Sequence, residues 1–411
     1  MAAQSTYHHS YPGKGIIFHI LLLVFPVCTL ICGCTYPIDI DYDENDRIVV
    51  FNGDIIAGSE SVIYGYLSKG MKEKRATDPT SDYFGYGTFP VEGYIEGEDG
   101  SRIVGTTMAD NSIKFDSRDL RTDVRYRVNL KDRNTGAEYR SNWAEVMKAP
   151  VVDSLSYYIN REENVLVTRI SITAEDTPYI SITSSYSWRV TPWAKSMFSY
   201  IPPDEYYADG QVVLGNDYPT DCYTANDDHI RTFATVTMKE GRLVNYDLDH
   251  FQKSDRKISG TLRLRVKARQ ISKESYLYWQ NLEKTSSMSG DLFTPTPSSM
   301  RGNISNIADE KEMVLGYIGI SYENCTDLYI RNSDHSFYRQ SKEMDEQLAR
   351  MLSDGTVPSP KWYESYMNGM MPYMDFYSEM GMFLGYNWID KRCLDCTFAG
   401  GSPDKPEDWK E

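Results

Sequence analysis

Apolar and polar residues alternate over many short segments of this chain, which is the pattern of β-strands with one buried face. The clearest segment is TLRLRVKARQ, residues 261–270. There Leu262, Leu264, Val266 and Ala268 alternate with arginines and a lysine. We therefore predict that the four apolar side chains face a core and that the basic side chains face away from it.

Turn signals separate these segments at short intervals. Asp99-Gly100 lies between two strand-like halves and predicts a tight hairpin. Helical spacing is predicted over residues 272–284, with Ser272 as the N-cap, and over residues 341–352. The chain is therefore expected to be mainly β, with tandem antiparallel β-sandwich domains, a few inserted helices and an irregular helical C-terminal part that is rich in aromatic residues and Met.

Changes in composition divide the chain into four parts. Residues 1–33 read as a signal peptide, and residues 34–46 as an acidic tether. Residues 47–150 are expected to form an N-terminal β-sandwich that ends at Pro150. Residues 151–411 are expected to form a second β-rich domain with helical insertions and a cysteine-containing tail.

The segment 362–388 is unusually rich in large apolar residues: 15 of its 27 residues are Met, Tyr, Phe or Trp. Its periodicity is poor, and glycines and Pro372 interrupt any long helix, so we expect an irregular, partly helical structure. Met and aromatic residues fill irregular cores, which we favour here, but they also make adaptable binding surfaces. In the second case the contact residues would be Trp362, Tyr363, Tyr366, Tyr373, Phe376, Tyr377 and Trp388.

The N-terminal segment indicates export. Lys14 is the one charged residue before an apolar run over residues 15–33, which ends at Cys34. Residues 31–34, Ile-Cys-Gly-Cys, resemble a lipobox, so we predict that Cys34 carries the lipid; the alternative is an uncleaved membrane helix. More than one acyl chain on Cys34 would be enough for stable anchoring.

The charge of the chain disfavours nucleic acid as a partner. There are 59 acidic and 43 basic residues, and the net charge is −16, whereas nucleic-acid binding relies on cationic neutralisation of phosphates. The basic stripe of residues 263–269 is an exception. It is either a docking face for an anionic ligand or partner or, as we favour, a solvated sheet face paired with nearby carboxylates.

Four cysteines remain once the signal peptide and Cys34 are set aside: Cys222, Cys325, Cys393 and Cys396. An even number in an exported protein predicts disulfides, and four cysteines allow three pairings. Cys393 and Cys396 form a CxxC motif. Zinc is disfavoured because no second ligand pair exists, and a redox couple because the motif runs into Gly-Gly and Pro. We therefore expect a structural disulfide whose pairing stays open.

Motifs that carry catalysis or hold metals are missing from the sequence, and no cofactor is expected. His229, His250 and His335 are isolated from one another. The nearest candidate is the run of Cys222, Asp227, Asp228 and His229, which would make the protein a hydrolase. We favour a loop there and a protein that is not an enzyme.

Several stretches together resemble a known family, the Bacteroidota lipoproteins of the domain-of-unknown-function 4249 family. The residues that carry the resemblance are Tyr278, Trp279, Gly290, Leu292, Phe293, Pro297, Gly302, Asn303, Leu315, Gly316, Tyr317, Cys393, Cys396, Gly400, Gly401, Pro406 and Trp409. The resemblance covers essentially all of the chain after Cys34, but the Met-rich segment 362–388 departs from it.

The resemblance implies an outer-membrane lipoprotein that is encoded beside a TonB-dependent receptor. It also implies an immunoglobulin-like or carboxypeptidase-regulatory-like first domain, and no activity. We therefore expect a surface-exposed, lipid-anchored accessory partner of a TonB-dependent nutrient transporter, facing the cell exterior, with an unknown nutrient as ligand. The alternative is a structural or assembly lipoprotein of the envelope that binds only protein.

Overall fold

The computed structural model describes residues 48–67, 87–206, 210–215, 218–224, 231–287, 301–339, 356–357, 362–398 and 400–410. All of these residues belong to one compact unit, and the other unit, residues 1–46 with 70–74, lies wholly outside the described ranges. The predicted signal peptide, Cys34, the acidic tether, the segment 341–352 and residues 227–229 also lie outside them.

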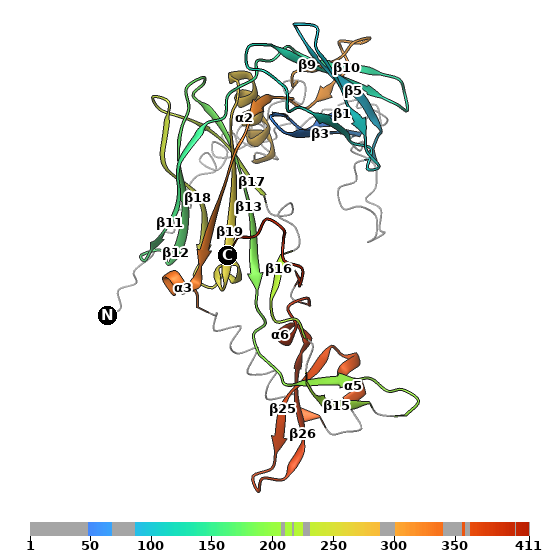
Figure 1. The fold of residues 1–411 in the computed structure, drawn as a ribbon, viewed down its shortest axis with the longest axis vertical. Helices are drawn as coiled ribbons and strands as arrows, with labels where there is room; N and C mark the ends of the chain where they lie inside the picture. Colours follow the sequence, from blue (N-terminus) through green and yellow to red (C-terminus); the bar gives the residue numbers. More distant parts are fainter. Residues whose placement is uncertain are drawn as a thin grey trace, which may run out of the picture. The chain divides into compact units, whose positions relative to one another are not determined.

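The first sandwich packs two sheets around one apolar core (Figure 1). One sheet has the order β21 (Val314–Leu315), β1 (Val49–Asn52), β3 (Glu60–Leu67), β8 (Ile113–Asp116) and β7 (Thr106–Thr107), with β4 (Gly87–Thr88) paired to β3. The other has the order β20 (Ile304–Asn306), β10 (Glu138–Ser141), β9 (Tyr126–Asp132), β5 (Val91–Gly97) and β6 (Arg102–Val104). The hairpin predicted at Asp99-Gly100 is confirmed: it joins β5 to β6, and Gly100 has φ +83°.

A segment from much later in the chain completes this sandwich, which corrects the expected division at Pro150. β20 pairs with β10 and β21 pairs with β1, while β22 (Ile320–Tyr322) pairs with β2 (Ile55–Ala57). The last two pairs are parallel, although we expected antiparallel sheets. Parallel strands need a long connection between them, and here that connection contains most of the second sandwich, so local patterns could not reveal the pairing.

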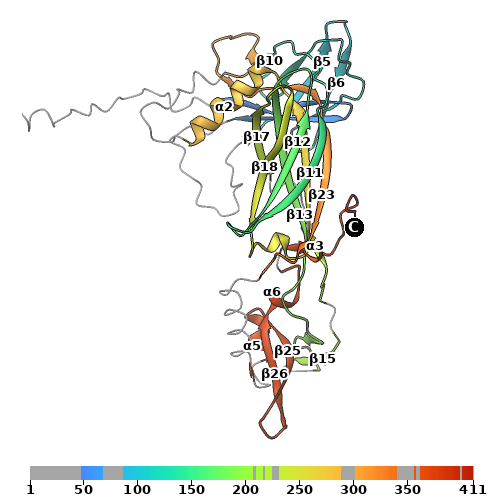
Figure 2. The same cartoon turned by 90° about the vertical axis from the view of Figure 1, so that its left-hand side faces the viewer.

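The second sandwich also has two sheets around a core of its own. The smaller sheet has the order β11 (Val151–Asn160), β12 (Val165–Thr173) and β18 (Arg242–Gln252). The larger has the order β23 (Asn324–Arg331), β19 (Thr261–Gln270), β13 (Tyr179–Val190), β16 (Cys222–Thr224) and β27 (Gly401–Ser402), with β17 (Arg231–Thr237) paired to β13. Figure 1 shows the two sheets as separate layers, and in Figure 2 the smaller sheet faces the viewer.

Two predictions about this sandwich are confirmed. The apolar residues of β19, Leu262, Leu264, Val266 and Ala268, are completely buried in its core. Helix α2 (Lys273–Ser287) begins directly after the expected N-cap, and the hydroxyl oxygen of Ser272 accepts a 3.1 Å hydrogen bond from the backbone amide of Ser275, the third residue of the helix. Among the described residues, no helix is long and apolar enough to span a bilayer.

The Met-rich segment is mostly a β-hairpin, so the expected irregular, partly helical structure is wrong except for one short helix. α5 (Trp362–Met367) is followed by β25 (Met370–Tyr377), and β25 pairs with β26 (Phe383–Asp390), which also pairs with β24 (Thr356–Val357). Pro372 is tolerated because β25 is an edge strand with a register shift beside that residue. Gly381, at φ +77°, forms the turn.

The remaining elements are short. They are β14 (Phe198–Ile201) and β15 (Gln211–Leu214), the 3-10 helix η2 (Arg256–Ile258), α3 (Asn332–His335) and α6 (Lys391–Leu394). β14 pairs with β15 and also packs beside β25. A small core of Met371, Ile389, Cys393 and Leu394 joins β25, β26 and α6.

The segment that returns to the first sandwich makes close backbone contacts, which we expect to be intolerant of a side chain. A Cβ atom added at Gly302 would lie 1.6 Å from the backbone oxygen of Gly316, whereas one added at Gly87 would meet nothing within 4 Å. We predict that Gly302→Ala lowers the free energy of unfolding by about 3 kcal/mol. Gly87→Ala should change it little. Urea denaturation measures both, and equal small effects would contradict the backbone packing described here.

Candidate functional site: a basic ladder, a buried disulfide and an exposed apolar hairpin

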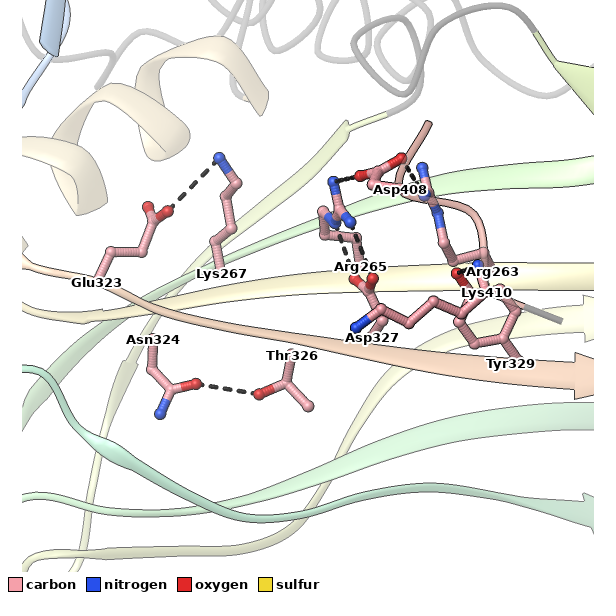
Figure 3. A network of polar contacts seen from close by, with 10 residues as sticks. All are labelled: Arg263, Arg265, Lys267, Glu323, Asn324, Thr326, Asp327, Tyr329, Asp408 and Lys410. Carbon is pink, nitrogen blue, oxygen red and sulfur yellow. Dashed lines mark hydrogen bonds and ion pairs between the residues drawn. The ribbon is translucent and has the colours of Figure 1, made fainter. Parts of the chain in front are cut away.

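The basic residues of β19 form a ladder of ion pairs on the outer face of the larger sheet, and Figure 3 shows three of them, Arg263, Arg265 and Lys267. Arg265 lies directly opposite Asp327 of β23, and Nε and Nη2 of the arginine each lie 2.8 Å from one carboxylate oxygen of the aspartate. This bidentate geometry is the strongest form of an arginine–carboxylate pair. It holds the Arg265 side chain flat against the neighbouring strand.

Asp408 bridges two rungs of the ladder from a distant part of the chain. Its Oδ1 atom lies 2.8 Å from Nη1 of Arg263, and its Oδ2 atom lies 2.6 Å from Nη1 of Arg265. Hydrogen bonds from Arg263 and Arg265 hold the pKa of the Asp408 carboxyl below its usual range. The side chain of Arg263 is only 2% exposed, so this pairing compensates a nearly complete loss of hydration.

The other end of the ladder joins the two sandwiches. Nη1 of Arg269 lies 2.7 Å from Oδ2 of Asp54, while the other carboxylate oxygen of Asp54 accepts a 2.9 Å hydrogen bond from the amide of Gly319. Burial alone would lower the pKa of the Arg269 guanidinium, but the carboxylates of Asp54 and Glu323 raise it. Lys267 lies 3.5 Å from Glu323 as well.

Both interpretations of the basic stripe can now be judged. All four basic residues of β19 are paired with carboxylates, which confirms the pairing that we favoured but not the solvated face expected with it. The face is not uniformly hydrated, however, because the side chains of Arg263 and Arg269 are 2% and 13% exposed. The sequence could not reveal this burial, since the covering groups come from β1–β2 and from residues 401–410.

The cysteine pairing left open by the sequence is settled for two residues: Cys222 is bonded to Cys396. This buried disulfide ties β16 to the segment that follows α6. Cys325 and Cys393 are thiols that take no part in a disulfide, so the expectation that all four cysteines form disulfides is wrong. Burial raises the pKa of the Cys393 thiol to about 11, so that the thiol is protonated at neutral pH.

The seven candidate contact residues do not form one surface, which corrects the grouping made from the sequence. Trp388 is completely buried and contacts the ring of Tyr200, which also contacts Tyr366. Trp362, Tyr373 and Phe376 are partly buried as well. Only Tyr363 and Tyr377 are well exposed. The favoured interpretation, a mostly packed layer, therefore holds for five of the seven.

The turn of this hairpin nevertheless exposes large apolar side chains, most of which the sequence analysis did not single out. We call residues 377–384 the hairpin tip. The exposed fractions are 52% for Tyr377, 84% for Met380, 58% for Met382, 49% for Phe383 and 52% for Leu384. Two backbone hydrogen bonds, from the amide of Ser378 to the carbonyl of Met382 and from the amide of Gly381 to the carbonyl of Ser378, order the backbone that carries these side chains.

The exposed apolar surface continues beside the hairpin. A shallow depression of about 360 Å³ is lined by Lys195, Met197, Phe198, Tyr373, Met374 and Asp375. Met197 is 68% exposed, and Leu214 of the adjoining strand β15 is 82% exposed. Flexible methionine side chains around a depression suit contacts with an apolar protein surface.

A larger cavity, of about 660 Å³, lies where the first sandwich meets α2 and the loop around Gly302. Several residues that carry the family resemblance line it, but their polar atoms are used internally. The Tyr278 hydroxyl accepts a 3.0 Å hydrogen bond from the amide of Gly316, and the hydroxyls of Ser272 and Tyr317 lie 3.0 Å apart. The side chain of Asn303 bonds both backbone groups of Ile318. These residues therefore hold the junction together.

No group of three or more His, Cys, Asp or Glu residues within the described ranges is arranged to hold a metal ion. His250 is exposed on β18, while His335 packs its ring against Tyr157 and Phe337. The possible hydrolase site around His229 lies outside the described residues, except for Cys222, which is in the disulfide.

Comparison with known proteins gives one family match. The family model described as "domain of unknown function (DUF4249)" matches residues 35–325. No curated protein matches the chain. One solved structure, titled "Complete structure of manganese lipoxygenase of Gaeumannomyces graminis and partial structure of zonadhesin of Komagataella pastoris", aligns over 56% of this chain and 89% of its own. The identity is 9% and the TM-score is 0.12, which is too low to carry an argument.

The Asp54–Arg269 pair gives a direct test of the ladder. Arg269→Met leaves the partly buried carboxylate of Asp54 without its cation and removes one of the two cations beside Glu323, so we predict a loss of about 2 kcal/mol in the free energy of unfolding. Arg125→Met is the matched control, because it removes an exposed arginine paired with Glu98 and should change stability little. Urea denaturation of both variants would contradict the burial argument if their midpoints shifted equally.

The thiols should differ in reactivity. At pH 7 we predict that maleimide modifies Cys325, which is exposed, and leaves the buried Cys393 unmodified until the protein unfolds. Peptide mapping without reductant should also find the peptides of Cys222 and Cys396 linked. A linkage between Cys393 and Cys396, or a label on Cys222 in the folded protein, would contradict the pairing.

Proposed function

The chain belongs to the domain-of-unknown-function 4249 family, and from that premise and the exposed hairpin tip we propose a non-catalytic accessory role. The protein would be an outer-membrane, surface-exposed lipoprotein that binds a TonB-dependent nutrient transporter. The single observation that carries the binding role is the group of large apolar side chains exposed at residues 377–384.

Exposed apolar area of this kind favours a protein partner. Contiguous apolar patches are uncommon on monomeric soluble proteins, and they mark interaction sites when they occur. The tip supplies methionine, phenylalanine, leucine and tyrosine side chains, of which Met380 is 84% exposed. Met and aromatic residues are also enriched at the centres of protein interfaces.

The shape of the surface fits the same role. The rings of Tyr377, Phe383 and Tyr386 contact one another along the hairpin, which limits the rotamers open to them before binding. Less side-chain entropy is then lost when a partner covers them. The depression next to the hairpin offers room for a side chain of the partner.

Lipidation at Cys34 supplies the second part of the proposal. An anchor of this kind would keep the protein on the membrane that holds the transporter, so binding would occur between two molecules in the same surface. Confinement of this sort raises the effective concentration of each partner for the other. A modest apolar surface is then sufficient for a lasting complex.

The test is a detergent extraction of the tagged, lipidated protein from its native outer membrane, followed by affinity purification. We predict that a TonB-dependent barrel is recovered in a stoichiometric amount. The variant Met380→Asp/Met382→Asp, which places charges on the tip, should reduce its recovery about tenfold.

Val104→Asp/Val244→Asp is the matched control, because these valines are 69% and 67% exposed on β6 and β18 and lie outside the hairpin. Recovery of the barrel should be unchanged in this control. A protein that purifies alone would overturn the transporter role and favour an envelope protein with a structural or assembly function. If the tip variant recovered as much of the barrel as the wild-type chain does, the hairpin tip could not be the binding surface.

A further inference from the structure

The segment 401–410, which we call the strap, crosses the outer face of the larger sheet beside the basic ladder. It begins at β27, which pairs with two residues of β16, just after the disulfide at Cys396. Beyond β27 the chain is mostly exposed until Trp409, which is 4% exposed. The strap therefore holds the sheet through a few residues near 408–410.

A four-residue cradle receives these residues; its members are Arg263, Arg265, Tyr223 and Tyr329. The two arginines bind the Asp408 carboxylate at 2.8 Å and 2.6 Å. The two tyrosine rings lie edge-on to the Trp409 ring, with centroids 5.1 Å and 5.5 Å away. The guanidinium carbon of Arg263 lies 5.4 Å from the centroid of the same ring. The cradle thus contacts a carboxylate and an adjacent indole together.

The sheet provides space for this arrangement. In the strand register, Ser185 and Ser187 of β13 lie opposite Arg265 and Arg263, so small side chains border the arginines on one side. On the other side, Tyr329 of β23 lies opposite Arg263, and its hydroxyl accepts a 2.8 Å hydrogen bond from the amide of Lys410. The pocket for the indole ring therefore depends on the sheet, while the strap supplies only the ring.

The charge around the cradle favours an acidic occupant. A shallow depression of about 660 Å³ on the same face is lined in part by Arg265, Tyr329 and Arg331. The Arg331 side chain has no ion-pair or hydrogen-bond partner among the residues that the structure describes. Once the strap is displaced, Arg263, Arg265 and Arg331 face one carboxylate, that of Asp327, so the positive charge of this face exceeds the negative charge.

We propose that the cradle is a recognition site for a carboxylate followed by an aromatic ring. In this arrangement the strap occupies the site within its own chain, and a segment of a partner protein with an acidic residue before a tryptophan binds there by displacing the strap. This site is separate from the hairpin tip, and it does not rest on the transporter role proposed above.

The strap competes from within the same molecule, so its effective concentration at the cradle is high. A segment that arrives from solution then binds with an apparent affinity reduced by the fraction of molecules whose cradle is open. The binding site is therefore concealed in the unmodified protein. Weakening the strap should reveal it without any change to the cradle.

The experiment uses the full chain with Asp408→Asn/Trp409→Ala, which loosens the strap, and a labelled peptide of residues 403–410, PDKPEDWK. We expect fluorescence anisotropy to show that this peptide binds the loosened variant at least about tenfold more tightly than the wild-type chain. A peptide with Asn and Ala in place of Asp408 and Trp409 should not bind either protein.

Two further variants separate recognition from non-specific attraction. Adding Arg263→Gln to the loosened variant should abolish binding, whereas adding Arg125→Gln, an exposed arginine of the first sandwich, should leave it unchanged. A loosened variant that is folded by circular dichroism yet does not bind the peptide would overturn the proposal. Equal binding of both peptides would overturn it as well.

The wild-type chain gives a second readout if the loosened variant does not fold. An excess of the PDKPEDWK peptide should speed hydrogen exchange at the amide of Lys410, which is bonded to the Tyr329 hydroxyl while the strap is in place. The amide of Val128, which is bonded to Ser141 in the first sandwich, serves as the internal control and should not change. Unchanged exchange at Lys410 with saturating peptide would overturn displacement.

Discussion

Two arginines on β19 that are largely shielded from water impose the main constraint on this structure. The side chain of Arg263 is 2% exposed and that of Arg269 is 13% exposed, so each needs a carboxylate close by. Those carboxylates are distant in sequence: Asp54 follows β1, while Asp408 lies on the strap. One strand therefore connects the first sandwich, the larger sheet of the second and the strap through ion pairs, and separation of either partner would break a pair that is shielded from water.

Residues 304–322, which return to the first sandwich, help to place the carboxylate that pairs with Arg269. The amide of Gly319, just before β22, donates to Asp54 and fixes the carboxylate that faces Arg269. The close approach of Gly302 to the backbone of Gly316 leaves no room for a side chain between the two segments. The residues that carry the family resemblance near this junction are thus accounted for by packing and by hydrogen bonds within the chain.

The parts of the fold that depend on neighbours in sequence could be predicted. The buried face of β19, the turn at Asp99-Gly100 and the N-cap at Ser272 each follow from a few adjacent residues. The parallel pairs of β1 with β21 and of β2 with β22 could not, because their partners lie more than 250 residues apart. In the Met-rich hairpin both faces carry large apolar residues, so alternation was hidden and the exposed tip was missed.

The hairpin tip and the cradle differ in how they can bind a partner. Burial of the apolar side chains at the tip is favourable against any apolar surface, because the hydrophobic effect has no direction. The tip can therefore distinguish partners only by how well their shape covers it. The cradle holds arginines that are already desolvated, and a ligand must bring a carboxylate to replace Asp408. Salt acts on the two surfaces differently, because screening weakens the encounter of charged groups and leaves apolar burial almost unchanged. Ionic strength thus distinguishes the two modes of binding within one chain.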